Sequence, residues 1–466
     1  MLIGFVVLYL LMTIAIGLLA ARKVHNSTDY IVAGRSLPLY VTIATVFATW
    51  FGSETVLGTS STFLEKGIGG IISDPFGASL CLILVGLFFA KPLYRMKLLT
   101  IGDFFRLKYG RTIEVLISLA IMVSYLGWVA AQLTALGIMF HVITLNALSI
   151  TAGILLGAAI VLLYTLFGGM WSVAITDFIQ MVIIIIGLVI ISYLLADKAG
   201  GVDVVIHHAI KAGKLSHFFP DASFPSILSF IAAWVTMGLG SIPQQDVFQR
   251  VMSAKDEKTA QRGSVIGGIL YFIFAFIPIF LAYSAFIIDP ELVNQGLAGD
   301  SQLILPHLIL QHTAIPMQVL FFGALLSAIM STASGALLAP SAMFAENIVR
   351  GFFPFLSDKA MLLLLRSTMV SFTGLALLYT LNSELSIFGM VENAYQVTLV
   401  GVFVPLFAGV YWEKANTTGA IGSILLGVTT WLTLTLAFPN SIMPAQLGGL
   451  IAAFVGMGLG SYLKKS

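Results

Sequence analysis

The strongest constraint on this chain is the recurrence of apolar runs of about 20 residues from one end to the other. Of its 466 residues, 59% are hydrophobic and only 9% are charged, whereas an ordinary soluble domain is about 25% charged. A run of this length is what an α-helix needs to cross the hydrocarbon core of a bilayer. The composition therefore indicates a polytopic membrane protein and excludes a soluble enzyme, a disordered chain and a nucleic-acid-binding protein.

Thirteen hydrophobic segments can be delimited, and each is expected to cross the membrane. Lipid offers the backbone no hydrogen bonds, so segments this long and apolar span it as helices rather than as barrel strands. The predicted fold class is therefore an all-α membrane protein. The segments are 1–21, 38–63, 70–91, 113–142, 148–167, 172–196, 226–243, 264–288, 316–347, 363–381, 386–411, 417–437 and 442–462.

The placement of basic residues predicts the orientation. With thirteen spans the two termini lie on opposite sides, and an N-terminus outside puts 19 Lys and Arg residues in the cytoplasm and four outside. Cytoplasmic loops carry an excess of basic residues. We therefore expect a cytoplasmic-membrane protein with its N-terminus outside and its C-terminus inside.

The sequence contains no pattern for a cofactor or a resident metal. The single cysteine, Cys81, cannot form an internal disulfide, and neither an HExxH pair nor a GxxxxGK[ST] loop occurs. We expect no cofactor and no direct use of ATP by this chain.

The second segment carries polar and small residues where lipid demands a continuous helix. Trp50, Gly52, Ser53, Glu54 and Thr55 lie near its middle. A helix that unwinds here would expose carbonyls that bind a cation and amides that bind an anion. The alternative is an intact helix whose small residues serve packing, but a carboxylate inside the bilayer costs about 3 kcal/mol or more unless it is paired or hydrated.

The seventh segment predicts a second break. Gly238, Gly240, Ser241 and Pro243 fall within six residues, which makes a continuous helix improbable. Two interrupted spans at the second and seventh positions are the pattern of an internal repeat of two five-helix halves.

The ninth segment carries hydroxyls on an otherwise apolar helix. Ser331 and Thr332 are adjacent, with Ser327 and Ser334 nearby. Such hydroxyls commonly bond back to carbonyls of their own helix. Together with free carbonyls from an unwound neighbour, they would instead supply the oxygens that a hard cation such as sodium prefers.

Polar residues in two further segments are candidates for the same site. Asp177 lies about two turns inside the sixth segment, where it either favours a helix start or lines a cation pathway. Trp128 and Gln132 share one face of the fourth segment, where aromatic residues usually serve packing but a glutamine needs a partner. A polar group also lies in the eleventh segment: Glu392, Asn393, Tyr395 and Gln396.

Five stretches together resemble the sodium:solute symporter family. Their order and spacing, with the thirteen segments, extend the similarity over nearly the whole chain. The stretches are Tyr30–Pro38, Gly168–Gln180, Phe248–Gly263, Ile329–Ala342 and Phe403–Ala420.

The resemblance implies a LeuT-like fold with 13 transmembrane helices in a single transporter domain, 1–466. A leading helix and loop (1–37) would precede two inverted five-helix repeats (38–225 and 226–411), and two trailing helices (412–466) would follow. It also implies a sodium site, with Asp177 on the sodium exit route. The sodium ligands implied are the carbonyls of Ala48, Phe51 and Ala328 and the hydroxyls of Ser331 and Thr332.

The function implied is uptake of a small organic solute driven by sodium, with an amino acid such as proline or a choline-like amine as the solute. The proline-type branch has an acidic residue where this chain has Trp50, and the choline-type branch has a tryptophan where this chain has Gln244. A channel or a solute sensor on the same fold is the alternative. The residues expected to contact the solute are Trp50, Glu54, Thr55, Trp128, Gln132, Trp234, Ser241 and Gln244.

Overall fold

The computed structural model describes residues 2–463, without the side chains at positions 21, 164, 167, 168 and 463. Lys464 and Lys465, which entered the charge count above, lie outside the described residues. Apart from one isolated bridge between Leu37 and Ala254, the regular structure of the described residues is helical. The all-α prediction is confirmed.

The helices are labelled α for α-helices and η for short 3-10 or π-helices. In the first half of the chain they are α1 (Leu2–Ala20), η1 (Ala21–Lys23), α2 (Ser27–Val32), η2 (Ala33–Arg35), α3 (Leu39–Phe47), η3 (Glu54–Thr59), α4 (Ser60–Lys66), η4 (Ile68–Ile71), η5 (Ile72–Gly77), α5 (Ala78–Leu84), η6 (Val85–Phe89), α6 (Ala90–Arg95), α7 (Ile101–Tyr109), α8 (Arg111–Ile143), α9 (Ile150–Lys198) and α10 (Val202–Lys211). In the second half they are α11 (Phe224–Gly240), α12 (Gln245–Met252), α13 (Glu257–Ile288), α14 (Pro290–Ala298), η7 (Ser301–Leu303), α15 (Ile304–His312), α16 (Ile315–Met343), η8 (Phe344–Val349), α17 (Arg350–Phe352), α18 (Asp358–Asn382), α19 (Ile387–Thr398), η9 (Leu399–Phe403), α20 (Val404–Tyr411), α21 (Thr417–Ala437) and α22 (Ala445–Leu463).

Within residues 2–463, ten helices are long and apolar enough to cross a membrane, and an eleventh arises if α11 and α12, bent by 49°, form one span. The two other predicted segments are also helical. Segment 38–63 is divided among α3, η3 and α4, and segment 148–167 begins α9 with the short apolar stretch Ile150–Leu163. The count of thirteen spans stays a prediction.

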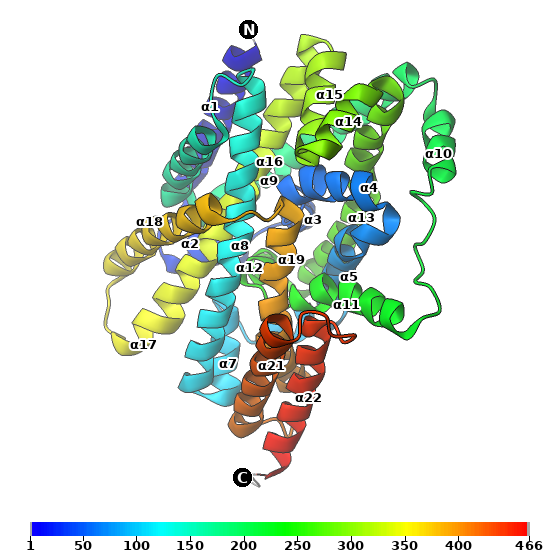
Figure 1. Ribbon diagram of the computed structural model, residues 1–466. Coiled ribbons are helices and arrows are strands. Elements are labelled where there is room, and N and C mark those ends of the chain that lie inside the picture. The colour runs from blue at the N-terminus through cyan, green and yellow to red at the C-terminus, as the bar shows by residue number, and fades with distance from the viewer. Residues whose placement is uncertain (1, 464–466) are drawn as a thin grey trace.

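The helix α16 forms the centre of the molecule. All of its residues from Phe321 to Met343 are buried, and it contacts α1, α8, α9, α12 and α18. Figure 1 shows α1, α10, α14 and α15 toward one end of the bundle and α7, α17 and α22 toward the other. Because α16 is buried, its hydroxyls face protein rather than lipid.

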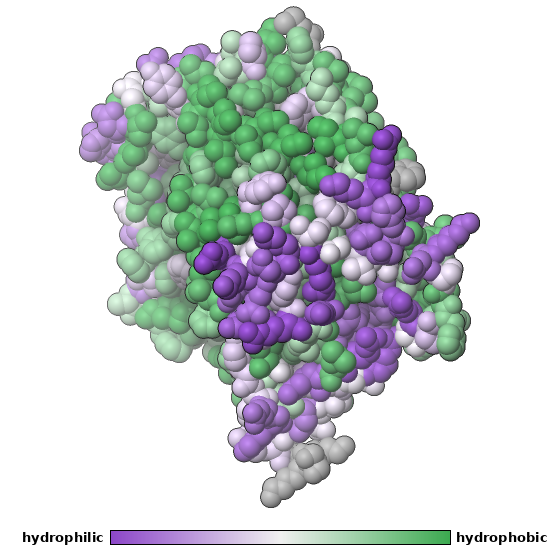
Figure 2. Space-filling model, turned by 180° about the vertical axis from the view of Figure 1, so that it is seen from behind, coloured by the Kyte–Doolittle hydropathy of each residue, from purple (hydrophilic) through white to green (hydrophobic). Residues whose placement is uncertain are grey.

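The surface has the composition expected of a protein embedded in a bilayer. Figure 2 shows a broad apolar area over the upper part of one face, with hydrophilic side chains gathered below it. Large apolar side chains are exposed on several long helices, among them Leu11 and Leu19 of α1 and Ile186 of α9, which are 57%, 57% and 53% exposed. In water such exposure would be unfavourable, whereas lipid tails solvate it.

Both predicted helix breaks are confirmed. The helix α3 ends at Phe47 and helical structure resumes at Glu54, while α11 ends at Gly240 and α12 begins at Gln245. Pro243 in the second break has no N–H with which to continue a helical ladder. A Cβ atom at Gly240 would lie 2.5 Å from the carbonyl oxygen of Tyr395, so only glycine fits there without a shift.

The two trailing helices, α21 and α22, pack through glycines. A Cβ atom at Gly456 would collide with the backbone of Gly422, and one at Gly460 would lie 2.6 Å from the carbonyl oxygen of Thr418. Small residues let membrane helices approach closely enough for dispersion contacts and weak hydrogen bonds to hold them together. This pair is thus a close-packed unit at the C-terminal end of the described chain.

Replacing Gly456 by Leu should separate α21 from α22 and destabilise the protein by about 2 kcal/mol, because a side chain is forced into a closed contact. Thermal unfolding in detergent, followed by fluorescence-detected size exclusion, measures the effect. Gly458→Leu is the matched control, since nothing lies within 4 Å of a Cβ atom at Gly458. Equal melting temperatures for the two variants would contradict the packing role.

Candidate sodium and solute site

The break after α3 releases a backbone carbonyl toward α16. In a continuous helix the Gly52 N–H would donate to the Ala48 carbonyl, but here it donates to the Trp50 carbonyl at 2.7 Å. The Ala48 carbonyl instead accepts from Thr332 Oγ1 at 3.2 Å. A Cβ atom at Gly52 would lie 3.0 Å from the same hydroxyl. The unwound segment and α16 are therefore in direct contact.

The neighbouring hydroxyl points elsewhere. Ser331 Oγ donates to Asp177 Oδ1 on α9, and both side chains are fully buried. The adjacent hydroxyls of α16 thus diverge, with Thr332 facing the break and Ser331 facing the carboxylate.

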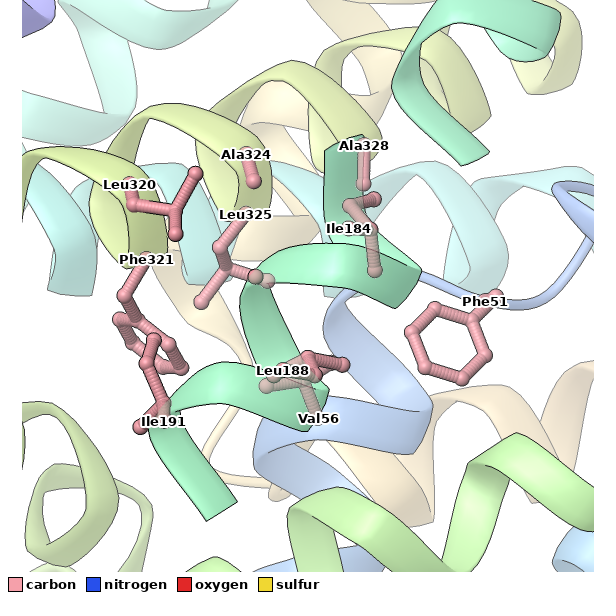
Figure 3. Close-up of a pocket in the computed structure, with 11 residues that line it drawn as sticks. Phe51, Val56, Ile184, Leu188, Ile191, Leu320, Phe321, Ala324, Leu325 and Ala328 are labelled. Carbon is pink, nitrogen blue, oxygen red and sulfur yellow. The ribbon is translucent and has the colours of Figure 1, made fainter. Parts of the chain in front are cut away.

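Phe51 and Ala328 border the same apolar pocket from two sides. Figure 3 shows Phe51 on the unwound segment and Ala328 on α16, with Ile184 of α9 between them and Leu188 of α9 beside Val56. Four of the residues implied as sodium ligands, Ala48, Phe51, Ala328 and Thr332, therefore lie near the break, whereas the Ser331 hydroxyl is turned to Asp177. Their carbonyl and hydroxyl oxygens are suitable ligands for a hard monovalent cation, so the residues fit a sodium ion.

A buried arginine, which the sequence reasoning missed, closes one side of this cluster. Arg250 of α12 is only 1% exposed, and its guanidinium lies 3.6 Å from Asp177 Oδ2 and 3.9 Å from Asp246 Oδ2. Tyr125 donates to Asp246 Oδ1 at 2.6 Å. The guanidinium sits against Gly335 of α16, where a Cβ atom would lie 2.6 Å from it. The sequence did hold a signal for this residue, because Arg250 follows closely after the predicted break in the seventh segment. A cation buried there needs carboxylate partners.

Four aromatic side chains pack together at the unwound segment, and we refer to them as the aromatic box. The indole N–H of Trp50 donates to the Tyr395 hydroxyl at 2.8 Å, and its ring lies 6.2 Å from that of Tyr271 and 6.3 Å from that of Tyr395. The Trp128 ring lies 5.7 Å from that of Tyr395. All four side chains are buried and pack against one another.

The carboxylate of Asp74 adjoins the aromatic box, and a second buried carboxylate, Glu54, precedes Thr55 in the chain. The Tyr271 hydroxyl lies 2.7 Å from Thr55 Oγ1 and donates to Asp74 Oδ1, while Thr59 donates to Asp74 Oδ2 at 2.6 Å. Glu54 is 1% exposed, and neither of its oxygens has a hydrogen-bond partner among the described residues. The sequence reasoning missed Asp74, although an Asp inside a predicted membrane segment was a signal for function.

The remaining predicted solute residues divide into three groups. Gln132 is fully buried beside the first break, with Oε1 3.6 Å from the Cβ position of Gly52 and its amide unpartnered in the described structure. Ser241 and Gln244 lie at the second break, where Gln244 donates to Ser124 at 3.0 Å. Trp234 lies apart from the aromatic box and packs against Phe76 at 5.9 Å and Phe230 at 6.3 Å.

The sequence profile described as "Sodium:solute symporter family" matches residues 30–427 of this chain. The chain belongs to the sodium:solute symporter family. The high-affinity choline transporter 1 of Torpedo marmorata is 32% identical to it over 448 residues, which cover 91% of this chain and 74% of that protein. The osmoregulated proline transporter OpuE of Bacillus subtilis (strain 168) is 27% identical over 477 residues, which cover 97% and 92%.

The fold is shared with a solved structure described as the substrate-bound outward-open state of a Na+-coupled sialic acid symporter. The two align with a TM-score of 0.84 and 19% identity over 100% of this chain and 98% of that one. The LeuT-like fold is confirmed. This family member is therefore a multi-pass, sodium-coupled symporter of a small organic solute and not an enzyme. The repeat boundaries at 38–225 and 226–411 stay predictions.

Replacing Thr332 by Ala should raise the sodium concentration for half-maximal uptake about tenfold, because one oxygen ligand is worth roughly 1.5 kcal/mol. Uptake into proteoliposomes at varied sodium measures it. Ser371→Ala is the control, since the Ser371 hydroxyl is exposed and donates to the Ser367 carbonyl of its own helix. An unchanged sodium requirement in Thr332→Ala would remove this hydroxyl from the site.

Proposed function

We propose that this protein uses the inward sodium gradient to import a small organic cation, a choline-like amine. The observation that carries the proposal is the aromatic box together with the buried carboxylate Asp74, which accepts a hydrogen bond from the Tyr271 hydroxyl. Aromatic faces attract an ammonium group by cation–π interaction, most strongly when water is excluded. The similarity to high-affinity choline transporters supports the same class of solute.

A zwitterion such as proline fits this site less well. Its carboxylate would enter a site that already adjoins the buried Asp74. Arg250 is the single Lys or Arg side chain buried in the described part of the chain, and it already faces Asp177 and Asp246. An added negative charge would thus lack a basic partner, and uncompensated buried charge is strongly unfavourable.

Coupling between sodium binding and solute binding follows from the order of residues in the break after α3. Ala48 accepts a hydrogen bond from Thr332 of α16, and Phe51 shares a pocket with Ala328, while Trp50, between them in sequence, belongs to the aromatic box. Sodium bound at Ala48 and Thr332 would hold the unwound segment in the conformation that places Trp50. The two ligands then bind cooperatively, and each raises the affinity of the other by the same factor.

The sodium gradient supplies enough energy to import the solute against its own concentration gradient. One sodium ion crossing the membrane contributes about 2.3 kcal/mol per 100 mV, and its concentration ratio adds to this. Alternating access requires that the solute site open to each side in turn. A channel would instead conduct at rates orders of magnitude higher and without saturation at modest turnover.

Purified protein in liposomes should take up radiolabelled choline or a related amine only when sodium is higher outside, with saturation in solute. Trp50→Leu should raise the half-saturating solute concentration at least about fivefold, since a buried cation–π contact is worth about 1–2 kcal/mol. Trp431→Leu is the control, because Trp431 lies on the trailing helix α21 and its indole N–H donates to Gln396 of α19. Proline uptake with no amine uptake would overturn the proposal.

We also propose that the protein lies in the cytoplasmic membrane with its N-terminus outside. The segment around α10 and the segment around α17 lie at opposite ends of the bundle, as this orientation requires (Figure 1). Asp221 and Phe355 are exposed on these two segments, with Phe355 98% exposed.

Single cysteines introduced as Asp221→Cys and Phe355→Cys in a Cys81→Ser background should label oppositely in intact cells. A membrane-impermeant maleimide should react with the first and reach the second only after permeabilisation. Cys81 is buried, so its removal only lowers background. The reverse pattern would invert the proposed orientation.

A further inference from the structure

The buried guanidinium of Arg250 faces two carboxylates at once. It lies 3.6 Å from Asp177 Oδ2 of α9 and 3.9 Å from Asp246 Oδ2 of its own helix, and none of the three side chains is more than 3% exposed. Both distances exceed that of a direct N–H···O hydrogen bond. Arg250 Nε and Nη2 have no hydrogen-bond partner among the described residues. Arg250 is therefore shared between the two carboxylates, whereas two other buried carboxylates have direct arginine contacts at 2.7 Å: Arg111–Glu114 and Arg350–Glu346.

Each of the two carboxylates uses its other oxygen for a hydroxyl group. Tyr125 of α8 donates to Asp246 Oδ1 at 2.6 Å and accepts from the Asp246 backbone N–H at 2.8 Å, so Asp246 is fixed to α8. Asp177 Oδ1 accepts from Ser331, the α16 hydroxyl that is implied as a sodium ligand. Arg250 thus lies between a carboxylate that is anchored to α8 and one that orients a candidate ion ligand.

The backbone of α16 brings the guanidinium close to that ligand. Gly335 follows Ser331 by four residues and so lies on the same side of α16, one turn away. A Cβ atom at Gly335 would lie 2.6 Å from Arg250 Nη2, which shows how closely the guanidinium packs there. Arginine stays charged in proteins. Since buried charges are only weakly screened, the exact position of this guanidinium affects how strongly the neighbouring oxygens attract a cation.

We propose that Asp246 is a positioning residue for sodium binding, because it holds Arg250 back from Asp177. Without the negative charge of Asp246, the guanidinium would move closer to Asp177. Asp177 would then be compensated by arginine and would contribute less to the attraction of sodium. A carboxylate that orients an ion ligand commonly tunes the affinity of the site in this way. This inference rests on the proposed sodium site and is independent of which solute is carried.

The first test measures sodium-induced thermal stabilisation of the purified protein without solute, at an ionic strength held constant with potassium chloride. Asp246→Asn should raise the sodium concentration for half-maximal stabilisation about fivefold, because a negative charge is lost and Arg250 is released. Asp246→Glu keeps the charge and should stay within about twofold of the wild type. Asp197→Asn, which removes an exposed carboxylate from α9, is the matched control. An unchanged sodium requirement in Asp246→Asn, or an equal increase in Asp246→Glu, would overturn the inference.

The second test asks whether Asp246 acts through Arg250. In an Arg250→Gln background, Asp246→Asn should change the sodium requirement less than about twofold, because no guanidinium remains to be held back. A fivefold change in both backgrounds would show that Asp246 acts by its own field and would overturn the inference. If Arg250→Gln does not fold, the comparison of Asp246→Asn with Asp246→Glu decides.

Thr332→Ala in the same thermal assay separates the two possible failures. If it leaves the sodium requirement unchanged, the proposed sodium site is wrong, and the role of Asp246 falls with it. If Thr332→Ala raises the requirement and Asp246→Asn does not, the site stands and only the role of Asp246 is overturned.

Discussion

The contact between the unwound segment after α3 and the hydroxyl face of α16 is the interaction on which the rest of the structure depends. It exists because the Gly52 N–H turns back to Trp50 and leaves the Ala48 carbonyl to Thr332. Irregular backbone at membrane depth is tolerated only where protein or water satisfies it. Here α16 satisfies it, and since α16 is buried along nearly its whole length, the irregular segment is shielded from lipid.

The sequence predicted the fold and the location of the breaks well, because both depend on local chemistry. Apolar runs identify membrane helices, and Gly52, Gly240 and Pro243 interrupt them for reasons that hold in any fold. The assignment of the sodium ligands needed the resemblance to a family, since spacing alone does not place Thr332 beside Ala48. That contact joins residues 284 positions apart.

Side-chain direction was beyond the reach of the sequence. Ser331 and Thr332 are neighbours, yet one bonds to α9 and the other to the break, because successive residues on a helix point about 100° apart. Arg250 and Asp74 were missed for a related reason: each becomes meaningful only when its partners, Asp177 or Tyr271, arrive from distant segments. Trp234 was named for its residue type, and the structure places it in a separate aromatic cluster with Phe76 and Phe230.

The position of Trp50 between Ala48 and Phe51 also limits how this transporter can be altered. A change of side chain at Trp50 would act on the backbone that carries the proposed sodium ligands, Ala48 and Phe51, on either side of it. Trp128 comes from α8, outside the unwound segment, whereas Tyr271 of α13 also packs against Phe51, with ring centroids 6.2 Å apart. Protein engineering aimed at a different solute should therefore begin at Trp128, where a substitution leaves the sequence of the unwound segment unchanged.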